Sequence, residues 1–480
     1  MTRAAHDAPS SGSFAALVLA AGQGTRMKSA LPKALHTLAG RPMLSYPVDA
    51  ALEAGAGRVV VVVGRGADAV REMLATRYDA RVLTALQPEQ RGTGDAARCG
   101  AEALDADVGM IAILNGDCPL ITARAVGALL KRARTANVPA ALVTTHLDDP
   151  RGYGRILRDA QGHIVRIRED RDCSPDEAAL REVNPGVYAV VGAFFRGAVA
   201  RLRTNNAQGE LYLTDMVEIA AREGGVADLA WDARELAGVN DRNELVACER
   251  ALVRGLLRRH GEAGVTIRRP ETTHVDADVE IAADVVVEGQ VELRGRCRIG
   301  AGARIDVGCV LQNVEVGAGA TLLPYTVAAD SVVGERARVG PFANLRAGSE
   351  LGEEVHIGNF VETKKTRIGK GSKANHLAYL GDGLIGERVN VGAGTIFCNY
   401  DGYGKYVTVL EDGVFVGSDS QLIAPVTVGK DGYVATGTTV TLDVPPDALA
   451  VGRARQENKL GYAGRVRARL KARADKERKK

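Results

Sequence analysis

A glycine-containing loop near the N-terminus has the residue types that bind phosphate. The loop runs from Leu19 to Arg26 and follows an apolar stretch, 15–20. Gly22 and Gly24 leave backbone N–H groups open to a phosphate, and the guanidinium of Arg26 can bind its oxygens. No third glycine completes a dinucleotide fingerprint, and no Lys-Ser or Lys-Thr pair completes a P-loop. The loop therefore predicts phosphate binding of another kind.

Asp117 is the best candidate for a metal ligand. It comes shortly after the apolar stretch 110–114, which we interpret as a buried strand. A carboxylate at the end of such a strand, beside phosphates, can hold Mg²⁺, because this hard cation keeps several waters and needs few protein ligands. The alternative is that Asp117 caps a helix before Pro119.

The C-terminal half has polar segments that interrupt a regular repeat. One interruption lies between Ile357 and Ile385 and contains 359–365 and 371–382, which include His376. A second holds 398–402. Loops that break a regular coil are where functional residues concentrate.

The repeat itself is a branched aliphatic residue at every sixth position between Val279 and Val440. A period of six fits a coil with three short flat faces, each of which points one aliphatic side chain inward. Glycine often follows and tolerates the corner. A β-sandwich with regular turns is the alternative. The in-phase residues are Ile281, Val287, Leu293, Ile299, Ile305, Leu311, Val333, Val339, Leu345, Leu351, Ile357, Val416, Leu422, Val428, Val434 and Val440.

The N-terminal half alternates short apolar stretches with helical ones. The apolar stretches are 15–20, 59–63, 110–114 and 140–144. This alternation predicts an α/β domain with a mostly parallel sheet, whose ligands bind beyond the carboxyl ends of the strands. A connecting helix is predicted at 245–259.

Composition indicates a soluble globular protein of two or more domains. The 480 residues are 46% hydrophobic and 25% charged, and no apolar run is long enough to cross a membrane. We therefore expect a cytoplasmic protein. The seven cysteines are scattered without a C-x-x-C pair, so we expect reduced thiols.

The net charge of +3 conceals a basic end. Residues 465–480 hold nine Lys or Arg against Asp475 and Glu477. Such a tail could bind nucleic acid or a membrane surface. A solvated, partly helical end that keeps the protein soluble is the simpler interpretation.

Two resemblances follow from these motifs. The six-residue repeat resembles the hexapeptide repeat of left-handed parallel β-helices, a family of trimers with acyl-transfer sites between subunits. The glycine loop continued by 31–35 resembles the signature of the sugar-1-phosphate nucleotidylyltransferases. Together, over roughly 14–460, the chain resembles the bifunctional bacterial enzymes that join N-acetylglucosamine-1-phosphate uridyltransferase to glucosamine-1-phosphate acetyltransferase.

The resemblance to the sugar-1-phosphate nucleotidylyltransferases implies a site for a uridine nucleotide and a sugar, with Mg²⁺ on Asp117 and Asn240. This chain has Asn115 where the family often has Tyr, and Pro185 where it often has Thr. The residues assigned to UTP and the sugar are Leu19, Ala20, Ala21, Gly22, Arg26, Lys33, Gln87, Gly92, Thr93, Asn115, Gly116, Asp117, Gly154, Glu169, Asn184 and Asn240.

The resemblance to the bifunctional enzymes implies an acetyl-transfer site in which His376 is the general base. A base is needed because an amine must lose a proton before it attacks a thioester. Asn375 replaces a usual Gly and Thr436 a usual Ala. Nothing in the sequence activates Cys398 as a nucleophile. The resemblance assigns Arg346, Lys364, Tyr379 and Asn390 to glucosamine-1-phosphate, and Ala393, Asn399, Tyr400, Ser418, Thr436 and Arg453 to acetyl-CoA.

These inferences predict five segments: a disordered leader (1–13), a uridylyltransferase domain (14–241), a linker helix (242–263), a left-handed β-helix (264–455) and a basic tail (456–480). The expected protein is a homotrimer that uses acetyl-CoA, UTP and Mg²⁺ to make UDP-N-acetylglucosamine, with no nucleic-acid partner and no membrane insertion. One alternative is a nucleotidylyltransferase whose β-helix is only a trimerising or regulatory platform. Another is a non-catalytic nucleotide-sensing subunit, which we would expect to lack Arg26, Lys33 or Asp117.

Overall fold

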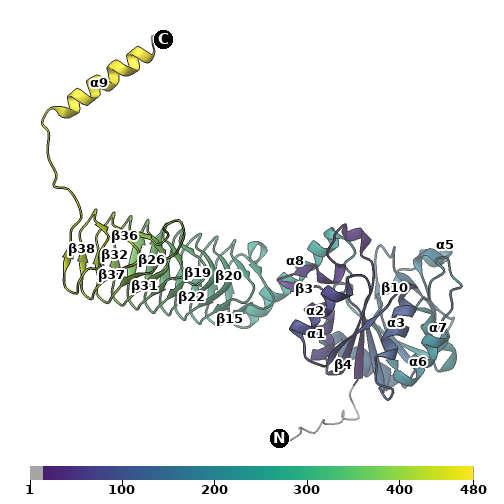
Figure 1. The fold of residues 1–480 in the computed structure, drawn as a ribbon. Coiled ribbons are helices and arrows are strands. Elements are labelled where there is room, and N and C mark those ends of the chain that lie inside the picture. The colour runs from purple at the N-terminus through teal and green to yellow at the C-terminus, as the bar shows by residue number, and fades with distance from the viewer. Residues whose placement is uncertain (1–13, 479–480) are drawn as a thin grey trace, which may run out of the picture. The chain divides into compact units, whose positions relative to one another are not determined.

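The computed structural model describes residues 14–478, and these form two compact units (Figure 1). One unit holds the chain through Arg259 together with Val275–Asp278, and the other holds His260–His274 and the chain from Val279. Helix α8 (Arg242–Glu262) occupies the predicted linker. The predicted leader, 1–13, lies outside the described residues.

A ten-stranded mixed sheet forms the centre of the N-terminal unit. Its strands are β1 (Phe14–Ala20), β4 (Ala56–Val63), β5 (Val82–Leu86), β6 (Met110–Asn115), β7 (Ala140–His146), β8 (Gly154–Arg158), β9 (Ile164–Arg168), β10 (Glu182–Asn184), β11 (Tyr188–Val191) and β12 (Val226–Ala230). They follow the order β5-β4-β1-β6-β11-β7-β10-β8-β9, with β12 on β7. The pairs β5–β4, β4–β1, β1–β6 and β12–β7 are parallel, whereas β11 is antiparallel to both β6 and β7. The predicted α/β class is confirmed.

Helices cover both faces of this sheet because its strands carry apolar residues on both sides. Along β1, Ala16 and Val18 pack on one side, and Ala15 and Leu17 pack on the other. The first side is covered by α1 (Ser45–Glu53), α2 (Ala67–Arg77) and α4 (Ala123–Ala136), and the second by α3 (Thr93–Glu102), α6 (Gly192–Ala200) and α7 (Asp215–Glu223).

The second unit is a parallel β-helix, as the six-residue repeat predicts. One ladder of eleven short strands runs from β13 (Thr266–Ile267) to β40 (Leu449–Ala450). Seventeen further strands form two interleaved ladders, which the seven-residue strands β20 (Val310–Val316) and β22 (Val327–Val333) join around a corner. The three ladders are the three predicted faces.

The repeating aliphatic residues fill the interior of this coil. Val287, Leu293, Ile305, Leu311 and Leu345 are fully buried, whereas Ile281, in the first turns of the coil, is half-buried. Burial of each such side chain stabilises the fold by roughly 1.5–3 kcal/mol.

Coil length changes where the repeat is interrupted. Arg338 pairs with His356, eighteen residues on, whereas His356 pairs with Lys373, seventeen residues on. Asn390 pairs with Phe415, twenty-five residues on, so one coil carries an inserted loop. His376 lies in a seventeen-residue coil, and Ala393, Asn399 and Tyr400 lie in the long coil, whereas Arg346 lies in the eighteen-residue coil.

The C-terminal end is a sixteen-residue helix, α9 (Tyr462–Glu477), with no buried residue. Among the described residues, no helix has both the length and the apolar character needed to cross a membrane.

Candidate active sites

The predicted phosphate loop and Asp117 emerge at the same edge of the N-terminal sheet. Strands β1 and β6 are parallel neighbours, with Leu19 beside Asn115 in register. Just past this pair, the N–H of Gly116 donates to the carbonyl of Leu19 at 2.8 Å. The loops that follow both strands therefore begin side by side, as expected for an α/β site.

The two loop glycines differ in what they require. Gly24 has φ of +60°, and a Cβ there would lie 2.7 Å from Cβ of Lys33, so both conformation and space favour glycine. Gly22 is exposed, and no atom lies within 4 Å of where its Cβ would be. Its backbone is therefore open to a ligand.

Four predicted residues meet beside this loop. The Lys33 ammonium lies 2.6 Å from Oδ2 of Asp117 and 3.4 Å from Oδ1 of Asn240. Nη2 of Arg26 donates to the same Asn240 oxygen at 2.8 Å. The N–H of Val239 donates to the Asp117 carbonyl at 2.9 Å, which holds the segment before Asn240 against the end of β6.

The donor set of Asp117 and Asn240 fits a magnesium ion. Their oxygens converge on one cation, the Lys33 ammonium, and both are hard ligands of the kind that Mg²⁺ takes. Residues 14–478 contain no group of three or more His, Cys, Asp or Glu placed to hold a metal. An ion here would therefore complete its shell with phosphate oxygens and water.

The predicted base-recognition residues also lie together. Gln87 is buried, and its amide donates to the carbonyl of Gly92 at 3.2 Å and to Asp95 at 2.9 Å. Gly92 has φ of +103°, and a Cβ there would lie 2.5 Å from the carbonyl of Leu211. The sequence analysis missed Asp95, which orients the Gln87 amide from the first turn of α3.

The two departures from the family pattern in this unit contact each other. Nδ2 of Asn115 donates to the carbonyl of Pro185 at 3.2 Å. Asn184, the next residue back, accepts from the N–H of Gly186 at 3.0 Å and donates to the hydroxyl of Tyr188 at 2.6 Å. Asn115 and Asn184 are thus fixed around one turn between β10 and β11.

Glu169 and Gly154 lie together on the antiparallel side of the sheet. Burial raises the pKa of Glu169, and the Thr214 hydroxyl, which donates to Oε1 at 2.8 Å, opposes this shift. A Cβ at Gly154 would lie 2.6 Å from the Ile167 side chain and 3.7 Å from Oε2 of Glu169. Thr214 is a further residue of this site that the sequence pattern did not single out.

In the β-helix, His376 is exposed at the end of β29 (Lys373–His376). Its Nδ1 lies 2.8 Å from Oδ1 of Asn359, which pairs in register with His376 on the preceding coil. Because an amide oxygen only accepts, this contact favours a proton on Nδ1. Nε2 is then left with the lone pair that a general base needs.

Three cations gather away from His376, two on a different ladder and one on the inserted loop. Arg346 follows β24 (Asn344–Leu345), donates to Oε1 of Glu362 at 2.8 Å, and lies on the ladder that holds Lys364 in β27 (Glu362–Lys364). Lys405 of the inserted loop lowers the pKa of Lys364 through a direct contact and through charge repulsion, and Arg346 adds to this effect. Like charges this close favour a bound anion. The sequence analysis missed Lys405.

Tyr379 and Asn399 lie beside these cations. Glu362 pairs with Tyr379 and Lys364 pairs with Gly381 in β30 (Tyr379–Gly381). A Cβ at Gly381 would lie 2.5 Å from the Tyr379 hydroxyl and 2.8 Å from Nδ2 of Asn399. Asn399, which the resemblance assigns to acetyl-CoA, therefore lies with residues assigned to the sugar phosphate.

The other acetyl-CoA residues follow the ladder of His376. Ala393, Ser418 and Thr436 occupy equivalent positions on successive coils: the Ala393 carbonyl accepts from Asp419 at 2.7 Å, and the Ser418 carbonyl accepts from Gly437 at 2.9 Å. The Arg453 guanidinium donates to the carbonyl of Thr436.

Asn390 begins β32 (Asn390–Val391), on this same ladder, beside Lys373. Asn390 therefore lies on a different ladder from Arg346, Lys364 and Tyr379, although the resemblance assigns all four residues to glucosamine-1-phosphate. Tyr400 is 60% exposed on the inserted loop. Cys398 has a pKa raised by burial, which disfavours a thiolate nucleophile.

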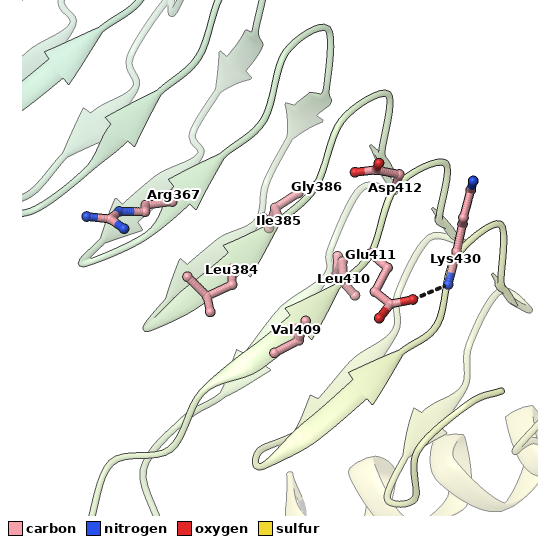
Figure 2. Close-up of a pocket in the computed structure, with 9 residues that line it drawn as sticks. All are labelled: Arg367, Leu384, Ile385, Gly386, Val409, Leu410, Glu411, Asp412 and Lys430. Atoms are coloured by element: carbon pink, nitrogen blue, oxygen red, sulfur yellow. Dashed lines mark hydrogen bonds between the residues drawn. The ribbon is translucent and has the colours of Figure 1, made fainter. Parts of the chain in front are cut away.

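A shallow, open pocket on the β-helix contains none of the predicted site residues (Figure 2). It has a volume of about 490 Å³ and lies over β31 (Gly383–Ile385) and β34 (Thr408–Leu410), between Arg367 and Lys430. Its Glu411 side chain accepts from the N–H of Lys430 at 2.7 Å. Of the predicted acetyl-transfer residues, His376 and Tyr400 are exposed, whereas Asn399 is buried.

Comparison with known proteins accounts for both units. Residues 16–211 match the family model of the MobA-like NTP transferase domain, and residues 270–368 match that of the GMPPB C-terminal domain. The bifunctional protein GlmU of Sorangium cellulosum is 56% identical over 466 residues, which cover 96% of this chain and 98% of that protein. The GlmU protein of Trichlorobacter lovleyi is 48% identical over 450 residues, 93% of this chain and 97% of that protein. The chain therefore belongs to the family of bifunctional GlmU proteins.

Proposed function

We infer that the protein is a bifunctional transferase that makes UDP-N-acetylglucosamine. It transfers an acetyl group from acetyl-CoA to glucosamine-1-phosphate, and then a uridylyl group from UTP to the resulting N-acetylglucosamine-1-phosphate. The observation that carries this proposal is that one chain holds two separate polar constellations, Lys33–Asp117–Asn240 and His376–Asn359.

Uridylyl transfer needs positioning and charge neutralisation. A 1-phosphate oxygen of the sugar attacks the α-phosphorus of UTP, a P–O bond forms, the bond to the β-phosphate breaks, and pyrophosphate leaves. Arg26, Lys33 and the amides around Gly22 offset the repulsion between the two anions. Mg²⁺, held by Asp117 and Asn240, would neutralise phosphate charge when bound. No side-chain nucleophile is required.

Acetyl transfer needs a base. The ammonium group of the aminosugar gives a proton to Nε2 of His376, and the free amine attacks the thioester carbonyl. The C–N bond forms and the C–S bond breaks, the attacking nitrogen releases its second proton to solvent, and the CoA thiolate takes a proton back from His376. Asn359 positions the ring, while Arg346, Lys364 and Lys405 bind the sugar phosphate.

A homotrimer explains why these groups lie on different ladders. His376 lies on the ladder of β26 (His356–Asn359), β29 and β32, whereas Lys364 lies on the ladder of β24, β27 and β30. In the proposed assembly, the His376 ladder of one subunit faces the cation ladder of another, so that one substrate contacts both. We propose that this assembly is cytoplasmic.

The alternative function makes the β-helix only a trimerising or regulatory platform. Two observations disfavour it. A platform has no use for three neighbouring cations, and the relatives named as bifunctional match both units of the chain.

One assay tests the proposal. Purified protein is mixed with glucosamine-1-phosphate, acetyl-CoA, UTP and Mg²⁺, each omitted in turn, and the sugar products are identified by mass. We expect N-acetylglucosamine-1-phosphate without UTP, and UDP-N-acetylglucosamine only from the complete mixture. Uridylyl transfer from supplied N-acetylglucosamine-1-phosphate, without any acetylation of glucosamine-1-phosphate, would support the platform instead.

A further inference from the structure

The C-terminal segment from Leu460 to Arg478 has features that neither transfer reaction uses. Every residue of this segment except Val466 is exposed, and α9 has no buried residue. Leu460 is 96% exposed, Tyr462 49% and Leu470 57%, so large apolar side chains face solvent along with the charges. Packing within the chain therefore does not explain this composition.

The helix separates these residues into rows. Tyr462, Val466 and Leu470 are spaced by four and share one side of α9. Cations flank this apolar row on both sides at spacings of four and seven residues, and Arg473 continues the row itself three residues beyond Leu470. One flank holds Arg465, Arg469 and Lys476, and the other holds Arg467, Lys471 and Arg478.

Few anions offset this charge. Within the segment only Asp475 and Glu477 are acidic, and Glu477 pairs with Arg473 across one helical turn at 3.3 Å. A surface pair of this kind contributes at most about 0.5 kcal/mol to the helix. The two cationic flanks therefore face solvent without matching carboxylates on the same helix.

We propose that the segment Leu460–Arg478 binds the surface of an anionic lipid bilayer, with the helix lying in the plane of the headgroups. An apolar row between two cationic flanks is the arrangement of interfacial helices, whose apolar side enters the acyl boundary while the cations bind lipid phosphates. Nucleic acid would satisfy the cations but leave Leu460, Val466 and Leu470 in water. The apolar row therefore favours the bilayer.

Co-sedimentation of the full-length protein with phosphatidylglycerol vesicles tests the proposal. We expect binding to these vesicles, little binding to phosphatidylcholine vesicles, and a large loss between about 0.1 M and about 0.5 M salt, because salt screens exposed charges. Equal binding to both lipids, or none to either, would overturn it.

Two tail variants separate the contributions. Arg465→Glu/Arg469→Glu/Lys476→Glu removes one flank and should weaken binding on the order of 100-fold, since each basic residue contributes about 1 kcal/mol. Leu460→Ser/Leu470→Ser keeps every charge and should weaken binding on the order of tenfold. Arg181→Glu/Arg222→Glu/Arg234→Glu makes the same charge change on exposed arginines of the N-terminal unit and should leave binding unchanged.

Two other outcomes would replace the bilayer with another partner. If single-stranded RNA displaces the protein from vesicles and binds equally to the Leu460→Ser/Leu470→Ser variant, the tail is a nucleic-acid site. If the tail variants change the oligomeric mass in solution, the tail is a contact between copies of this chain. Both transfer activities should stay at the wild-type level in the two tail variants.

Discussion

The two candidate sites differ in how far the chain itself completes them. In the N-terminal unit, Lys33 and Asp117 form an ion pair whose side chains are 14% and 34% exposed, and Asn240 joins them to Arg26. In the β-helix, Arg346 and Glu362 are 47% and 37% exposed, His376 is exposed, and Lys364 lies against another cation.

This difference reflects how the two folds place side chains. Parallel strands with helices on both faces bring several loops to one sheet edge, so residues as distant in sequence as Arg26 and Asn240 can meet. A coil with three faces points its polar side chains outward and has no lid of its own. The first site should therefore function within one chain. The second should need the phosphate group of its substrate, which binds the cations, and a second subunit.

The largest expected effect separates the two activities at the N-terminal site. Asp117→Ala leaves the Lys33 ammonium unpaired and removes the proposed Mg²⁺ carboxylate, so uridylyl transfer should fall by about 10³-fold or more. Pyrophosphate release measures this step, and CoA release should stay unchanged. Asp232→Ala, which breaks an exposed pair with Arg234 and the hydrogen bond from the Arg234 backbone N–H, is the control. Retained uridylyl transfer in Asp117→Ala would remove this residue from the metal site.

The reciprocal variant is His376→Ala. Loss of the proposed base should lower CoA release by about 10²-fold or more while pyrophosphate release persists. His356→Ala is a matched control, because His356 lies on the same ladder but outside the proposed site. If His376→Ala abolished both activities, the sites would not be independent.

The sequence predicted the features that depend on local pattern. The six-residue spacing of Val287, Leu293 and Ile299 predicted the coil and its buried positions, because one aliphatic residue per face must point inward. The apolar stretch before Asp117 predicted a strand end beside the glycine loop. The coil and the strand end could both be predicted because a regular element fixes the direction of each side chain along it.

The sequence analysis missed residues whose role depends on stacking between coils. Asn359 meets His376 because this coil has seventeen residues instead of eighteen. Lys405 meets Lys364 because the inserted loop returns along the coil. A one-residue change in coil length or the path of a loop leaves no periodic signal, so single-sequence reasoning could not assign these partners.

A smaller effect is expected at the cation cluster. Lys405→Ala removes one phosphate contact and should raise the KM for glucosamine-1-phosphate about tenfold, with little change in kcat. Because Lys405 lowers the pKa of Lys364, the ammonium of Lys364 loses its charge at a lower pH than an isolated lysine. In the variant that pKa rises, so the alkaline increase of KM should move to higher pH. Lys430→Ala, which changes a lysine that lines the pocket of Figure 2, should alter neither quantity.

The smallest effect is expected where the chain departs from its family in the acetyl-CoA row. Arg453 binds the backbone carbonyl of Thr436, a group that every residue type supplies, so the hydroxyl is not needed for this contact. Thr436→Ala should therefore change the KM for acetyl-CoA by less than about threefold, whereas Arg453→Ala, which removes a charged donor, should raise it about tenfold. Steady-state CoA release measures both. A large effect of Thr436→Ala alone would mean that the hydroxyl itself contacts the cofactor. The β-helix would then also form a specific site with side chains of one chain, as the N-terminal unit does.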